Sequence, residues 1–296
     1  MKTVGRSQGT LAVTLERLYR TYDLTYLQTS ALKFPHRYAR PNDQEVVGFL
    51  AAALAYGRVE CFTPVLDRFL ALLGPSPAAF VRNFDRDRHG SLLASLYYRF
   101  NTAADLGCLL VLLRQVLARY GSLEGCFLAG YTPEDPDIRP ALTSFAETLL
   151  AGDPRPYFRP GTLSPGMTHL VPSPRAGGAC KRLNLFLRWM VRQGDPIDFG
   201  LWRTVDPAKL IIPLDTHVAR VAQVLGLTMR RTPDWLMAEE ITRSLRRFDP
   251  RDPVKYDFAL CRYGMLNSRS RKNVHGSGFT VHRRATAGRS SVNHEL

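Results

Sequence analysis

Two residues of this chain, Lys181 and Asp215, have side chains that could do chemistry together. A lysine amine can attack an electrophilic carbon and form a Schiff base, whereas an arginine guanidinium keeps its proton and cannot. A nearby carboxylate could accept a proton or stabilise positive charge that develops on a substrate. The alternative is that the lysine is a solvated or phosphate-contacting residue and that the aspartate only caps a helix, which contributes on the order of 1 kcal/mol.

Lysine is scarce in this chain. Of 40 basic residues only six are lysines, which leaves 34 arginines. Arginine contacts phosphate at least as well as lysine, so a lysine in an arginine-rich chain suggests that the amine itself is used. The lysines are Lys2, Lys33, Lys181, Lys209, Lys255 and Lys272.

The sequence predicts a helix start beside each of the two residues. Gly177 and Gly178 lead into an amphipathic segment that holds Lys181 in its first turns. A glycine-containing hairpin at a helix N-terminus offers free N–H groups to a DNA phosphate without reading sequence, although an ordinary helix entry has the same pattern. Asp215 follows 34 positions later and precedes a second amphipathic segment, where we expect it to be the N-cap.

Apolar residues recur at helical spacing over most of the chain, so we expect an all-α protein. Further helices are expected at about 11–22, 46–56, 60–73, 103–120, 140–150, 232–248 and 252–263. Asn42 and Glu45 resemble a capping box, and the segments 74–77, 132–136 and 153–174 are expected to be loops. We expect one helical domain over residues 1–266 and a basic, disordered tail over residues 267–296, where apolar periodicity is lost.

Composition favours a polyanionic partner. The formal net charge is +14 and the pI is near 9.9, and basic proteins gain affinity for nucleic acid through counterion release. No apolar run reaches the roughly 18–20 residues that span a membrane, and the N-terminus lacks the apolar stretch of a signal peptide. We therefore expect a cytoplasmic, nucleoid-associated monomer on double-stranded DNA, with no membrane and no obligate protein partner.

The five cysteines are scattered and form no C-x-x-C pair. This spacing argues against disulfides, a zinc knuckle and a four-cysteine loop that would bind an iron–sulfur cluster. We expect neither a metal nor a cofactor.

The segment 214–221, L-D-T-H-V-A-R-V, resembles the V-D-T-H-V-x-R-V segment of helix-hairpin-helix DNA glycosylases, whose aspartate is catalytic. The usual L-P-G-V-G-x-K hairpin is replaced by G-G-A-C-K at 177–181, and the lysine lies farther from the aspartate, as in the archaeal 8-oxoguanine glycosylase branch. The segments 179–192, 209–217 and 252–260 look like the bacterial family DUF2400, and the resemblance extends to 48–59 and 98–101.

The resemblance implies a fold of two helical subdomains with the active site between them. It also implies base-excision repair, in which a damaged purine such as 8-oxoguanine is flipped from the duplex and removed. Lys181 would attack C1′ and form a Schiff base, giving AP lyase activity, while Asp215 would stabilise the sugar and handle the lysine proton.

Other site residues are expected around this pair. Gly177, Gly178, Arg182, Arg220 and Arg58 are predicted to contact DNA. Tyr56, Asp257 and Trp189 are predicted to line the substrate pocket, although aromatic residues on helices belong to the core more often. Arg188 and Arg192 are expected on solvated helix faces, and His217 is expected to be structural.

Two other functions fit parts of the sequence. A helix-hairpin-helix protein that binds DNA without cutting it would use the lysine only as a phosphate contact. An RNA-binding protein is less favoured, because the chain has no RNP-type motif and no KH loop.

Overall fold

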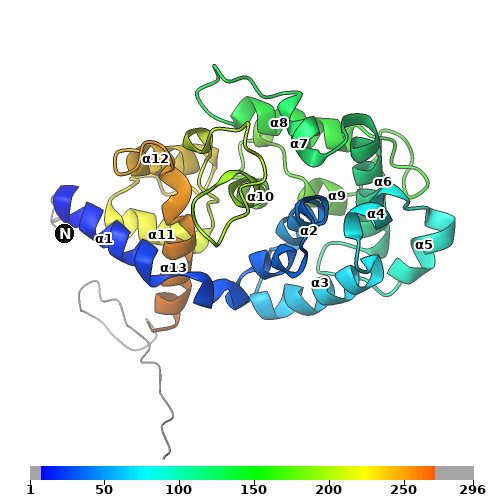
Figure 1. Ribbon diagram of the computed structural model, residues 1–296, viewed down its shortest axis with the longest axis horizontal. Coiled ribbons are helices and arrows are strands. Elements are labelled where there is room, and N and C mark those ends of the chain that lie inside the picture. The colour runs from blue at the N-terminus through cyan, green and yellow to red at the C-terminus, as the bar shows by residue number, and fades with distance from the viewer. Residues whose placement is uncertain (1–7, 271–296) are drawn as a thin grey trace, which may run out of the picture.

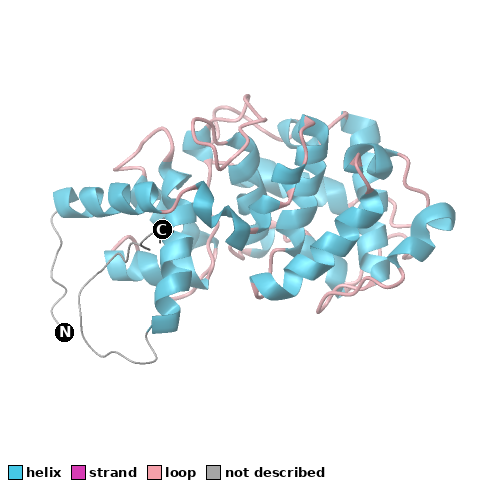
Figure 2. Ribbon diagram, turned by 60° about the horizontal axis from the view of Figure 1, so that its bottom comes forward, coloured by secondary structure: helices cyan, strands magenta, loops and turns pink. Residues whose placement is uncertain are grey.

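The computed structural model describes residues 8–270, and in this range the chain is helical with connecting loops (Figures 1 and 2). Its only β pairings there are two isolated bridges, Tyr98 with Asn101 and Gly178 with Asp234. The prediction of an all-α protein is confirmed.

The α-helices are α1 (Gln8–Thr21), α2 (Pro41–Leu54), α3 (Val59–Leu73), α4 (Pro77–Arg82), α5 (Arg86–Leu93), α6 (Ala103–Tyr120), α7 (Leu123–Leu128), α8 (Arg139–Leu150), α9 (Pro165–Leu170), α10 (Lys181–Val191), α11 (Thr216–Leu225), α12 (Trp235–Leu245) and α13 (Asp257–Ser270). The 3-10 helices are η1 (Leu24–Thr29), η2 (Ala31–Lys33), η3 (Pro35–Arg37), η4 (Pro174–Ala176), η5 (Pro207–Lys209) and η6 (Pro253–Tyr256).

The helices form two groups at the two ends of an elongated molecule (Figure 1). One group contains α1 and α11 to α13, so the start of the described chain packs beside its end. The other group contains α2 to α9. Helix α10 lies between the groups, packs along α2 and is tied to α13 by an ion pair, so it joins the two groups.

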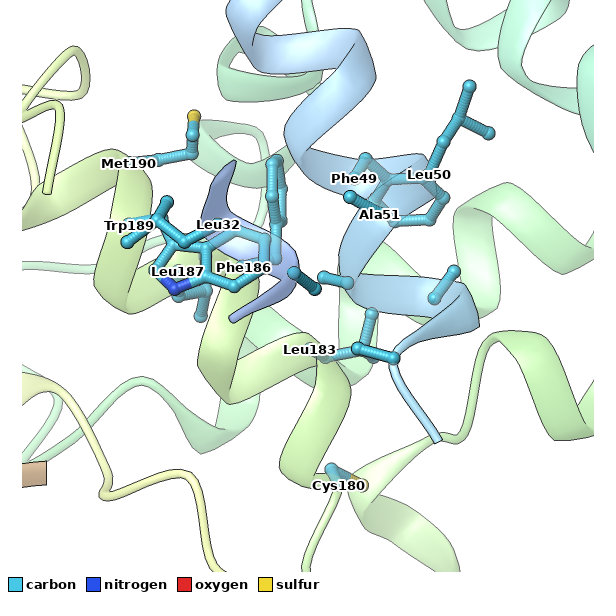
Figure 3. Close-up of a cluster of buried hydrophobic side chains, with 14 of the residues drawn as sticks. Leu32, Phe49, Leu50, Ala51, Cys180, Leu183, Phe186, Leu187, Trp189 and Met190 are labelled. Atoms are coloured by element: carbon cyan, nitrogen blue, oxygen red, sulfur yellow. The ribbon is translucent and has the colours of Figure 1, made fainter. Parts of the chain in front are cut away.

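Aromatic packing holds α10 in the core. Phe186 meets Phe49 of α2 edge to face with ring centroids 5.4 Å apart, and it meets Trp202 in the same way at 5.2 Å. Trp189 was predicted to line the substrate pocket, but its side chain is 0% exposed and lies in the same core cluster (Figure 3). That prediction was wrong, because the amphipathic face of α10 places this indole between helices.

Helix α2 carries two buried carboxylates that cap other helices. Asp43 accepts from the backbone N–H of Ala78 at 2.8 Å, and Glu45 accepts from those of Leu123 and Glu124 at 3.0 and 2.9 Å. Glu45 also accepts from the indole N–H of Trp202 at 2.9 Å. The predicted capping box was wrong, since α2 begins at Pro41 and includes both of its residues.

Several helix boundaries differ from the predicted ones. Helix α9 falls inside the expected loop 153–174, because Ser164 caps a helix too short to show periodicity. Helix α12 is capped by Asp234 and begins later than expected. Helix α13 continues to Ser270, so the predicted tail does not begin at residue 267. The remainder of that predicted tail, 271–296, lies outside the described residues.

Two arginines expected on solvated faces are buried instead. Arg188 and Arg192 are each 2% exposed. Arg188 pairs with Asp198 at 2.9 Å and with Asp257 at 2.5 Å, and Arg192 pairs with Asp198 at 2.5 Å and with Asp252 at 2.9 Å. Their partners come from the loop after α10 and from the start of the last helical segment, so this network joins α10 to α13.

We predict that Glu45→Ala lowers the free energy of unfolding by about 2–4 kcal/mol, because three buried donors lose their acceptor. Urea denaturation followed by circular dichroism would measure the change. Glu134→Ala, at an exposed position, is the control and should change stability by less than about 0.5 kcal/mol. Equal effects of the two substitutions would contradict the capping role.

The buried Asp257 should make the free energy of unfolding depend on pH. Burial raises its pKa from 3.8 to about 6; Arg188 opposes this shift and the charge of Asp215 adds to it. Because the folded-state pKa is the higher one, this contribution to stability is present below about pH 4 and is lost as the pH rises through about 6. The free energy of unfolding of the wild type minus that of Asp257→Asn should therefore fall over this interval. Urea denaturation at several pH values tests this, and a rising difference would contradict it.

Candidate active site

Lys181 is the first residue of α10 and follows a sharply bent loop. Gly177 and Cys180 both have left-handed backbone conformations, with φ of +77° and +45°. The loop is fixed to the start of α12, since the N–H of Trp235 donates to the carbonyl of Gly177 at 3.0 Å. No side chain caps the N-terminus of α10, so its first N–H groups and its dipole favour an anion.

Asp215 is the N-cap of α11, as predicted. Its Oδ1 accepts from the N–H groups of His217 and Val218, each at 2.9 Å. Its Oδ2 is not used by the cap and accepts from the Sγ of Cys261 at 3.5 Å. The cap therefore holds one oxygen in place and leaves the other for interactions outside the helix.

The charges of Lys181 and Asp215 both act on side chains of one face of α13. Asp257 and Cys261 lie four residues apart on this helix, so they share a face. Burial raises the pKa of the Asp257 carboxyl to about 6 and that of the Cys261 thiol to about 12. In both cases the charge of Asp215 raises the pKa further and that of Lys181 lowers it. The amine and the carboxylate, 34 positions apart in the chain, therefore lie within electrostatic range of one face.

Arg182 was predicted to contact phosphate, but its side chain is 8% exposed and makes its contacts inside the protein. Its guanidinium donates to the carbonyl of Ala53 at 2.9 Å and to that of His169, and it lies 5.1 Å from the ring centre of Tyr56. These contacts join α10 to the end of α2. The prediction was wrong, because a single sequence does not reveal that carbonyls at two helix ends would need this donor.

The other predicted DNA contacts lie at accessible positions. Arg58, Arg220 and Gly178 are exposed, and Gly177 is half-buried. Asp257 was predicted to line the pocket, but it is only 2% exposed and is held by Arg188 through one oxygen, while its Oδ1 has no hydrogen-bond partner among the described residues. That prediction was wrong, because the buried ion pair with Arg188 holds this carboxylate between α10 and α13.

Tyr56 is half-buried in an aromatic cluster that the sequence analysis did not find. Its ring is nearly parallel to that of Phe100, which is 60% exposed, with centroids 6.2 Å apart. Arg99 lies over both rings, at 5.8 and 5.4 Å. His169 meets both rings edge to face, and burial lowers its pKa to about 4, helped by the charges of Arg182 and Arg99, so it is neutral at pH 7. The signal that the sequence offered for this cluster is an aromatic residue directly after an arginine, at Arg99 and Phe100.

Cys261 was also missed as a site residue. The signal that could have found it is its four-residue spacing from Asp257, which places both on one helical face. Two cavities within residues 8–270 are lined by other residues, one by Glu16 and Tyr256 among others and the second by Arg139 and Arg175 among others.

Within residues 8–270, no three His, Cys, Asp or Glu side chains are grouped so that they could hold a metal ion. No helix within that range is long and apolar enough to cross a membrane.

Comparison with known proteins identifies the family but not the activity. Neither the curated proteins nor the solved structures contain a match to this chain. A family model described as "Protein of unknown function (DUF2400)" matches residues 31–266, which include Lys181, Asp215, Asp257 and Cys261. The chain therefore belongs to the DUF2400 family.

Proposed function

We propose that the protein is a DNA glycosylase with AP lyase activity, which removes an oxidised purine such as 8-oxoguanine. The observation that carries the proposal is that α13 contacts both elements that hold the pair: its Asp257 binds Arg188 on the helix that begins with Lys181, and its Cys261 donates to Asp215. A likeness to helix-hairpin-helix glycosylases in the segment 214–221 supports the same chemistry. The proposed setting is the nucleoid.

In the proposed reaction, the amine of Lys181 forms a bond to C1′ of the damaged nucleotide. The glycosidic bond breaks, and the base leaves with the bonding electrons and takes up a proton. The C1′–O4′ bond then breaks and the sugar ring opens to a Schiff base; of the two protons that the amine loses, one balances the proton taken up by the base and the other is taken up by O4′. Oδ2 of Asp215, which the helix cap does not use, would stabilise positive charge on the sugar and accept a proton.

The surroundings of the pair suit DNA. The uncapped N-terminus of α10 would bind a phosphate beside Lys181, and the exposed Arg58 and Arg220 would bind others. The half-buried Tyr56 and the exposed Phe100 offer aromatic faces on which a base could stack.

We predict that the wild type, but not Lys181→Gln, forms a covalent adduct with a lesion-containing duplex when sodium borohydride is present. Duplexes carrying 8-oxoguanine, uracil or an abasic site would rank the substrates by gel electrophoresis. Lys33→Gln is the matched control, because this lysine donates to Thr63 at 3.4 Å and lies 5.2 Å from the ring centre of Phe34, and the variant should trap like the wild type. No adduct and no base release, with salt-sensitive binding retained by all three proteins, would favour a helix-hairpin-helix protein that binds DNA without catalysis.

The substitution Asp215→Asn distinguishes the helix-capping role of Asp215 from its proposed role in the reaction. Asparagine caps helices nearly as well as aspartate, so we expect the free energy of unfolding to change by less than about 1 kcal/mol. The rate of adduct formation should fall by at least about 100-fold, because the carboxylate charge is lost. A variant that is equally stable and traps at the wild-type rate would exclude Asp215 from the chemistry.

A further inference from the structure

Helix α13 contacts both elements that carry the candidate chemistry. Through Asp257 it meets Arg188, which lies two turns after Lys181 on α10. Through Cys261 it meets Asp215 at the start of α11. A Cβ on Gly264 would lie 2.9 Å from the Cβ of His217, so α13 also approaches the first turn of α11 very closely. The position of α13 therefore constrains α10 and α11 together.

We infer that Cys261 is a positioning residue, whose thiol fixes the orientation of the Asp215 carboxylate for the reaction at Lys181. The inference rests on the proposed function. The cap fixes Oδ1, but a carboxylate held by one oxygen can still tilt about that contact. The thiol, 3.5 Å from Oδ2, restrains the second oxygen.

The chemistry of the thiol suits this role. Burial raises its pKa to about 12 and the charge of Asp215 adds to the shift, so the thiol keeps its proton. Two acceptors lie within reach of this proton, Oδ2 of Asp215 at 3.5 Å and Sδ of Met265 at 4.0 Å, and the charged carboxylate is the nearer and the stronger one. A protonated thiol is also a poor nucleophile, which argues against a catalytic cysteine. The other charged or titratable side chains near this contact are Lys181 from α10, His217 from α11, and Asp257 and Arg262 from α13.

Infrared difference spectra test the contact without any assumption about DNA. The spectrum of the wild type minus that of Cys261→Ala should contain an S–H stretch at a frequency lowered by hydrogen bonding, and this band should shift in Asp215→Asn. Cys126→Ala is the control, because that thiol is buried in α7, away from the site. A Cys261 band at the free-thiol frequency, or one that Asp215→Asn leaves unchanged, would overturn the inference.

Borohydride trapping tests the positioning role. We expect Cys261→Ala to lower the trapping rate about tenfold, the effect of losing one hydrogen bond to a charged group, and Cys261→Ser to restore most of it. An unchanged rate in Cys261→Ala, or a Cys261→Ser variant that traps no faster than Cys261→Ala, would overturn the inference while the proposed function stands. No adduct with the wild type itself would overturn both.

Discussion

The buried ion pairs of Arg188 are the interaction on which the arrangement of the candidate site depends. Arg188 lies on the helix that begins with Lys181, and it binds Asp257 at the start of α13. Removing one partner of such a buried pair costs about 3–5 kcal/mol, because the other charge is left without compensation. The lysine helix and α13 therefore cannot separate without exposing or stranding these charges.

Helix α13 also contacts Asp215, the second residue of the candidate pair. One turn beyond Asp257, Cys261 meets the carboxylate that caps α11. On the opposite side of α10, Phe186 packs on Phe49 of α2, and Arg182 binds a carbonyl at the end of α2. The helix that carries Lys181 is thus fixed by polar contacts to both helical groups, while no side chain caps its N-terminus.

Local sequence patterns were sufficient to predict elements whose signals lie within a few residues. Helix α6, with its strong periodicity and closing glycine, begins and ends where expected, and Asp215 caps α11 as expected. Contacts between distant segments could not be predicted in this way. Arg188 is separated from Asp257 by 69 positions, and Arg182 from Ala53 by 129, so these arginines looked like solvated residues or phosphate contacts. Trp189 was misplaced for the same reason, since helical periodicity does not say which apolar face meets a core and which meets a ligand.

Peptide mapping of the borohydride-reduced adduct identifies the reacting amine directly. The adduct with an abasic duplex would be digested with protease and nuclease and sequenced by mass spectrometry. A reduced deoxyribose remnant is expected on Lys181. A remnant on another lysine, such as Lys209 or Lys255, or no adduct at all, would contradict it.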